Sequence, residues 1–374
     1  MATQTPPPNR PQRIHLVDWL RGVAVVFMIL AHGIDAWLIP AAKVGPVYEI
    51  IKVASGIPAR LFLLLVGVSA AIQFDSSLRK GLPMTGLRNA LAKRGVMILG
   101  LAYVFRVQQW VLSRFYGGME TLFRVDILNA IGACMILVAL LATPRNGKRQ
   151  ILAALVGAAV FLSLGTTIGP AVFPAWIPRP ISSYIGGQRP MAWFSLFPWA
   201  AWALVGVPIG HLWVWVHEQP TRLRTCFRWT IGVGASLVLG VTLIRYINPA
   251  IIRYPNAVVM QMGPGIFFHR LGIIALLAGA GYFWRRTTGP RFSVLGQLGK
   301  TSLLIYWVHI ELCYGRLVYN FREKLPLAPA LALVLLLTTL MFGVSLARTH
   351  ALPRAWNWAH DRHVPRSPAD RERR

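Results

Sequence analysis

The stretch RIHLVDWLRGVAVVFMILAHGID, residues 13–35, is long and apolar enough to cross a bilayer as one helix. It nevertheless carries Asp18 and Arg21 near one end, and His32 and Asp35 near the other. Ionisable side chains within a membrane span are rare and usually face the interior of the helix bundle. These four residues therefore direct attention to function as well as to fold.

The composition of the whole chain is that of a membrane protein. Of its 374 residues, 55% are hydrophobic and only 14% are charged, which is too little charge to cover the surface of a soluble domain of this length. The sequence predicts an all-α, polytopic integral membrane protein with about ten transmembrane helices. The expected spans are residues 16–39, 57–75, 95–112, 125–143, 150–168, 193–215, 229–245, 265–284, 301–319 and 327–347.

The formal net charge of +27 comes from basic residues that cluster in short segments between the apolar runs. This is the distribution expected from the positive-inside rule, and it favours a membrane protein with both termini cytoplasmic over a nucleic-acid-binding protein. Residues 1–13 are predicted to be a disordered cytoplasmic N-terminus, residues 14–347 a transmembrane domain, and residues 348–374 a basic cytoplasmic tail. The three scattered cysteines show neither a disulfide framework nor metal-ligand spacing, and no metal site is expected.

The two polar pairs of the first span each have a functional and a structural interpretation. Asp35 lies three residues after His32, on the same helix face, where a carboxylate can receive an imidazole N–H and make the other ring nitrogen a better base. The structural alternative is an interhelix hydrogen bond made by His32. Arg21 can reach a phosphate of a cytoplasmic ligand while Asp18 holds it, or the two can form a structural ion pair.

Further polar residues fall within the later spans. His269 and Arg270 lie near the outer end of the eighth span, at a depth similar to that of His32, and His309 lies near the middle of the ninth. Arg106 and His211 lie within the third and sixth spans. Each of these alone is explained by packing, but several in one bundle suggest a polar cavity. The aromatic residues expected on the outer side can stack on a sugar or form an interfacial belt; they are Trp176, Tyr184, Trp193 and Trp199.

The first span resembles that of the heparan-α-glucosaminide N-acetyltransferase family and its bacterial relatives, through Arg13, Asp18, Arg21, Gly22 and His32. Further similar segments come in order along residues 13–315: PARLFLLLVGVSAAI (58–72), KRGVMILGLAYVFR (93–106), FRVDILNAIGACMILVALL (123–141), FSLFPWAAWALVGVPIGHLW (194–213) and LGQLGKTSLLIYWVHIEL (295–312).

This resemblance implies a transmembrane acyltransferase that moves an acyl group, expected to be acetyl, from cytoplasmic acyl-CoA to an extracytoplasmic glycan. The expected site residues fall into three groups. The catalytic group is His32, as general base, with Asp35 and His269; the acyl-CoA-binding group is Asp18, Arg21 and Arg94; the acceptor-binding group is Arg270, Trp199 and His309.

The chain departs from the family pattern in one respect. The resemblance implies an additional catalytic histidine in the loop after the first span, but residues 36–58, AWLIPAAKVGPVYEIIKVASGIP, contain none. Either His32 performs the base chemistry itself, or the reaction differs, or activity has been lost.

Two other functions stay open on the sequence. A transporter or flippase for a lipid or glycan would use the same polar cavity without catalysis, and a degenerate family member would serve as a structural partner. The partners expected are membrane lipids, acyl-CoA as co-substrate and a carbohydrate acceptor, with no nucleic acid and no permanently bound cofactor; a homodimer is left open. The expected location is the inner membrane of a bacterium.

Overall fold

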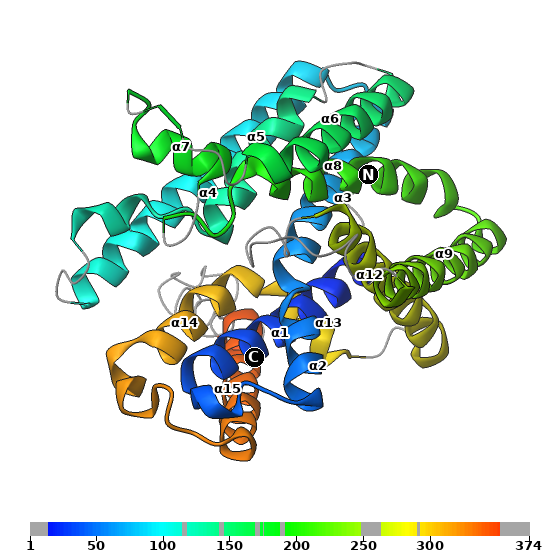
Figure 1. Ribbon diagram of the computed structural model, residues 1–374. Helices are drawn as coiled ribbons and strands as arrows, with labels where there is room; N and C mark the ends of the chain where they lie inside the picture. Colours follow the sequence, from blue (N-terminus) through cyan, green and yellow to red (C-terminus); the bar gives the residue numbers. More distant parts are fainter. Residues whose placement is uncertain are drawn as a thin grey trace, which may run out of the picture.

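The computed structural model describes residues 14–113, 118–141, 146–168, 173–174, 176–187, 191–247, 263–289 and 292–351. Within these ranges the chain is helical, with two isolated β-bridges and no strand (Figure 1). The long helices are α1 (His15–Trp37), α3 (Pro58–Arg79), α4 (Met84–Leu112), α6 (Gly147–Ile168), α8 (Leu196–Val216), α9 (Pro220–Ile247), α12 (Pro264–Thr288) and α15 (Leu327–Leu346). The shorter helices are α2 (Pro46–Ser55), α5 (Ile127–Leu141), α7 (Arg179–Gly186), α13 (Val294–Lys300) and α14 (Ser302–Tyr314).

Eight of the described helical segments are long and apolar enough to cross a membrane, with α2 and α3 counted as one. Two further apolar helices, α5 and α14, have 15 and 13 residues. Each predicted span overlaps one of these ten segments, so the all-α polytopic fold is confirmed. A helix as short as α14 rises only about 20 Å. Helix α13, which precedes it, packs against the inner half of α1.

The terminal segments predicted from the sequence lie mostly outside the described residues. This holds for residues 1–13 and for the tail from residue 352 onwards. The first residues of the expected tail continue α15 as one π-helical turn, η4 (Ala347–Ala351). Which face is cytoplasmic stays a prediction. We call the face at which α1 begins the inner face and the face at which it ends the outer face.

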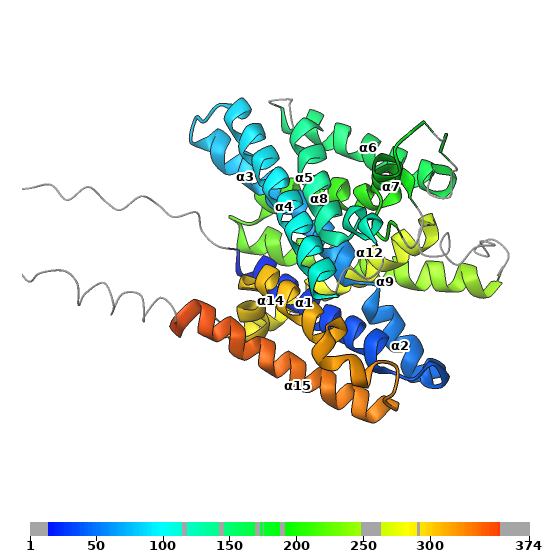
Figure 2. The same ribbon diagram turned by 90° about the vertical axis from the view of Figure 1, so that its left-hand side faces the viewer.

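Helix α1 is shared by the two apolar cores. Its inner half packs with α3, α5, α8 and α12 through residues such as Trp19 and Leu20, whereas its outer half packs with α4, α14 and α15 through residues such as Ile29. Figure 1 shows α4, α5, α6 and α8 above α1, with α13 and α14 beside α1 and α15 below it. In Figure 2, α15 runs alongside both α1 and α14. Side chains of α1 therefore meet neighbours from both halves of the molecule.

Two glycines allow α1 and α13 to touch through their backbones. A Cβ built on Gly22 would lie 1.8 Å from the carbonyl oxygen of Leu295, and one on Gly299 would lie 1.8 Å from that of Asp18. Small residues permit this close approach, which drives helix association where apolar lipid provides no hydrophobic force. The Arg21-Gly22 dipeptide thus combines a polar side chain with a backbone contact.

The ends of α1 and α8 are held by polar contacts at opposite faces. At the outer face, the amides of Glu323 and Leu325 donate to the carbonyls of Ala36 and Trp37 at 2.9 and 2.8 Å, so the connection between α14 and α15 is fastened to the end of α1.

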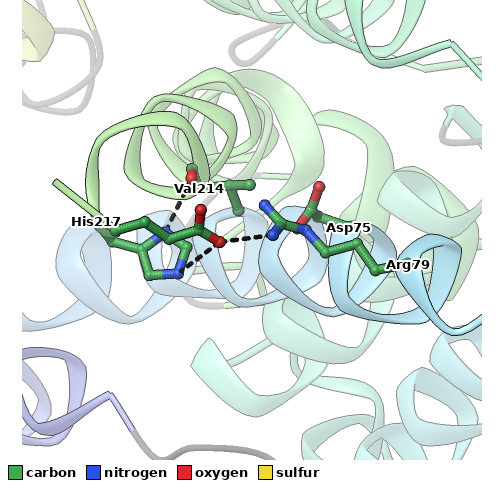
Figure 3. A network of polar contacts seen from close by, with 5 residues as sticks. Asp75, Arg79, Val214 and His217 are labelled. Atoms are coloured by element: carbon green, nitrogen blue, oxygen red, sulfur yellow. Dashed lines mark hydrogen bonds and ion pairs between the residues drawn. The ribbon is translucent and has the colours of Figure 1, made fainter.

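At the inner face, Arg79 of α3 bonds to Asp75 at 2.8 Å and to Glu218, just after α8, at 2.6 Å. Figure 3 shows this network, in which Nδ1 of His217 also lies 2.8 Å from the carbonyl oxygen of Val214. Exposed ion pairs of this kind stabilise a protein by about 1 kcal/mol or less.

The glycine contact gives a direct test of the fold. We expect Gly22→Ala to lower the melting temperature of the purified protein, because its new methyl group meets backbone that cannot move aside; overpacking of this kind costs about 1–3 kcal/mol or more. Gly343→Ala is the matched control, since a Cβ at Gly343 of α15 meets nothing within 4 Å. Equal melting temperatures for the two variants, measured in the same detergent, would contradict the backbone contact.

Candidate functional site

The outer end of α1 and the end of α14 together form a short chain of hydrogen bonds. The hydroxyl of Tyr314 donates to Oδ2 of Asp35 at 2.7 Å and lies 3.2 Å from Nδ1 of His32. Because a phenol has only one proton, Nδ1 of His32 is the donor in the second bond. This fixes the histidine tautomer and leaves Nε2 of His32 as the unprotonated nitrogen.

The expected pairing of His32 with Asp35 is therefore indirect in the structure. The carboxylate reaches the imidazole through Tyr314, a residue of α14 that the sequence analysis did not select. Tyr314 is separated from Asp35 by 279 positions along the chain, so no local spacing could reveal the contact. The one sequence feature that pointed to Tyr314 is its place near the end of the span that also contains His309.

A second histidine lies against His32. The ring centroids of His32 and His309 are 5.3 Å apart, and His309 is fully buried. Nδ1 of His309 donates to the carbonyl of Ile305 at 2.7 Å, while Nε2 is buried and has no hydrogen-bond partner among the described residues. In its neutral form His309 thus presents an unprotonated nitrogen in the interior beside His32. From the sequence, His309 was expected to bind the glycan acceptor.

The ring contacts that His32 makes with described residues come from α14, whereas His269 of α12 was expected to join it. His32 has ring contacts with His309 and Tyr314, both from α14. Arg270, the residue after His269, points towards α2 and donates from Nη1 to the carbonyl of Val53 at 2.7 Å. Its guanidinium complements the carbonyl end of α2.

Arg60 is a buried charged residue that the sequence analysis did not select. It lies 7% exposed in the first turn of α3 and donates from Nη1 to the carbonyl of Gly56. Its guanidinium lies 5.0 Å from the ring centroid of Trp199 and 6.0 Å from that of Trp202, within the range of cation–π contacts. Trp199, expected to bind the acceptor, is itself only 6% exposed and forms part of this packing.

At the inner end of α1, the predicted pair is present. Nη1 of Arg21 lies 3.7 Å from Oδ1 of the buried Asp18, and Nη2 donates to the hydroxyl of Ser69 on α3 at 3.3 Å. The side chain of Arg21 remains 34% exposed, so it is both held and accessible. Arg94, the other expected acyl-CoA contact, is exposed on α4 beside Gly95, whose backbone packs on α5.

A pocket of about 220 Å³ opens beside Tyr314 at the outer end of α4. One of its walls is fixed by Arg106, which forms an ion pair with Asp126 before the start of α5. Nε of Arg124 lies 3.8 Å from the same carboxylate. The aromatic residues expected at the outer side are engaged elsewhere: Trp193 lies 5.1 Å from Arg124, and Tyr184 accepts a bond from Asn129 at 2.8 Å.

Residues 13–247 match the model of the heparan-alpha-glucosaminide N-acetyltransferase catalytic family. The chain belongs to this family. A search among curated proteins found no match. The N-acetyltransferase match includes α1, with Arg21, His32 and Asp35, and ends with α9. His309 and Tyr314 of α14 lie beyond it, so the structure adds partners for His32 that the matched region does not contain.

The family assignment establishes the chain as an integral membrane protein of an acetyltransferase family that acts on glycans. The roles of individual residues are argued below from the contacts described above.

The buried Arg106–Asp126 ion pair can be tested as a support of the pocket wall beside Tyr314. We expect Asp126→Asn to reduce the free energy of unfolding by about 3 kcal/mol, because it leaves a largely buried guanidinium without its charge partner. Adding Arg106→Gln to this variant should cost less than the sum of the single changes. Glu120→Gln is the control, since its ion pair with Arg179 is exposed and its loss should matter little. Additive effects in a denaturation series would contradict a coupled pair.

Proposed function

We propose that the protein transfers an acyl group, acetyl in the first instance, from acyl-CoA at the inner face to a glycan acceptor at the outer face, in a bacterial inner membrane. The observation that carries this proposal is the Asp35–Tyr314–His32 chain, which holds His32 with Nε2 free to accept a proton. In this proposal His32 is the general base.

The reaction requires few groups. The acceptor amine or hydroxyl attacks the thioester carbonyl while its proton passes to Nε2 of His32; a C–N or C–O bond forms, and the C–S bond breaks. The CoA thiolate leaves and recovers the proton from His32, which returns the base to its starting form. A positioned histidine contributes about 10²–10⁴-fold to such a reaction.

Arg21 is the proposed contact for acyl-CoA. Its guanidinium is oriented by Asp18 and Ser69, and an oriented, partly exposed guanidinium suits the geometry of a phosphate. Arg21 precedes His32 by eleven residues on one helix, which corresponds to about 16 Å. An extended pantetheine arm is of comparable length, so the phosphates can stay near the inner face while the thioester approaches the base. Arg94 adds positive charge at the same face.

His309 supplies a second imidazole in place of the loop histidine that residues 36–58 lack. In neutral His309 the bond from Nδ1 to Ile305 selects one tautomer, and this neutral ring places no second positive charge beside His32 when His32 accepts a proton. Its buried Nε2 is an additional acceptor within the same site. This arrangement supports base chemistry by His32 in a chain without the loop histidine.

The base assignment predicts a graded loss of activity. We expect His32→Ala to lower acetyl transfer at least about 100-fold, and Tyr314→Phe to lower it about tenfold, because the phenyl ring keeps the packing but releases the orienting bond. Transfer would be measured with radiolabelled acetyl-CoA and protein in nanodiscs. His217→Gln, at the exposed inner end of α8, should leave the rate unchanged.

Two results would contradict the proposal at different levels. Full transfer by His32→Ala would remove the base assignment but keep the enzyme class. A wild-type protein that neither binds nor turns over any short acyl-CoA would remove the enzyme class and favour transport of a lipid or glycan.

The donor assignment predicts an effect on acyl-CoA alone. Arg21→Met should raise the KM for acetyl-CoA about tenfold, the loss expected when one charged hydrogen bond is removed, with little change in the KM for the acceptor. Arg224→Met, exposed near the start of α9, is the matched control for general loss of positive charge. An unchanged KM in Arg21→Met would reduce Arg21 to a structural partner of Asp18.

A further inference from the structure

The pocket at the outer ends of α4 and α14 has walls built from four segments. Residues of α4, of the 3-10 turn η2 (Met119–Phe123), of the end of α14 and of the start of the 3-10 turn η3 (Arg316–Phe321) line it. The side chains that matter for its chemistry are Arg106, Trp110, Thr121, Glu311, Tyr314 and Arg316. They combine positive and negative charge, two hydroxyls and one indole, which is the mixture of a polar ligand site with one apolar face.

The acidic group of the pocket is held in place by a polar chain. Nε2 of Gln108 donates to Oε1 of Glu311 at 3.3 Å, and Oε1 of Gln108 accepts from Nε1 of Trp307 at 2.9 Å. Gln108 is thus fixed in one orientation, and its amide holds one oxygen of the Glu311 carboxylate. A half-buried carboxylate in a membrane protein is unfavourable in free energy and usually has a functional reason.

The basic group of the pocket is likewise fixed. Arg106 bonds to Asp126 and donates from Nη1 to Oε1 of Gln109 at 3.0 Å. Its Nε is buried and has no hydrogen-bond partner among the described residues. Each of the two anchored nitrogens carries a second N–H, so the fixed guanidinium can still donate to an acceptor atom of a ligand.

The size of the pocket limits its occupant. Its volume of about 220 Å³ lies between the roughly 150 Å³ of a cavity that takes benzene and the 300 Å³ or more of sites for drug-sized ligands. It therefore fits one six-membered ring with polar substituents. Hydroxyl groups both donate and accept, so a sugar ring can bond to Glu311 and to Arg106 at once while its apolar face lies on Trp110.

Tyr314 joins this pocket to the proposed base. Its side chain lines the pocket, and its hydroxyl contacts both Asp35 and His32. We infer that this pocket binds the acceptor as one terminal sugar residue, held between Trp110 and the Glu311 and Arg106 side chains, with its reacting group towards Tyr314. This inference rests on the proposed function for its chemistry, but the pocket can be tested by binding alone.

The location differs from the one expected from the sequence. Trp199 is packed under Arg60, while Trp193 and Tyr184 are engaged by Arg124 and Asn129. Trp176 is 80% exposed and does not line the pocket. The acceptor is thus assigned to the pocket between α4 and α14, not to these four aromatic residues.

The test uses the full chain in nanodiscs and three soluble probes, the methyl glycosides of glucosamine, glucose and glucuronic acid. For the best acceptor of the three, Trp110→Ala should raise the KM about fivefold and Glu311→Gln about tenfold, with kcat and the KM for acetyl-CoA unchanged, which is the signature of lost ground-state binding. Trp176→Ala and Glu49→Gln, both at exposed outer positions, are the matched controls and should have no effect. Trp110→Phe should recover most of the affinity if Trp110→Ala folds poorly.

Direct binding separates the pocket from the catalytic proposal. Saturation-transfer NMR without acetyl-CoA should detect at least one of the glycosides on the wild type, and the signal should fall in Trp110→Ala and Glu311→Gln. No binding of any of the three, or an effect confined to Trp176→Ala, would overturn the inference even if acetyl transfer to another acceptor occurs. Binding in the pocket without any turnover of acetyl-CoA would keep the inference about the site and remove the proposed reaction.

Discussion

The backbone contact between α1 and α13 is the constraint on which the arrangement of the bundle depends. Gly22 and Gly299 face the carbonyls of Leu295 and Asp18, so neither helix can be displaced without a clash or a gap. In lipid, where helix association relies on close packing rather than on hydrophobic burial, such a contact fixes the position of both helices. It places α1 between the two apolar cores. Within this position Asp18 is buried, whereas Arg21 is partly exposed and Asp35 is exposed.

This position gives the two ends of α1 different surroundings. The inner pair, Asp18 and Arg21, is held by α3 and keeps part of its charge accessible. The outer pair, His32 and Asp35, is completed by Tyr314 of α14 and lies next to the buried His309. The proposed phosphate-binding group and the proposed base are thus carried at different depths by one helix, which can position both ends of a long substrate at once.

Features that depend on local spacing and composition could be predicted from the sequence. Hydropathy identified the helical spans, and the three-residue spacing predicted the Asp18–Arg21 contact, because both depend on helix geometry alone. Tyr314 was missed because its contact with Asp35 joins residues far apart in the chain. Arg60 was missed because the rings that it contacts, Trp199 and Trp202, belong to α8 and lie far along the chain. His32 could be selected from the sequence, but its spacing from Asp35 could not show that Tyr314 orients the imidazole.

The fastening of α1 to the connection before α15 has a mechanical consequence. Glu323 and Leu325 bond to the last turn of α1 through the backbone, and Tyr314 bonds to it through a side chain. Any tilt or piston movement of α1 must therefore carry α14 and α15 with it as one body.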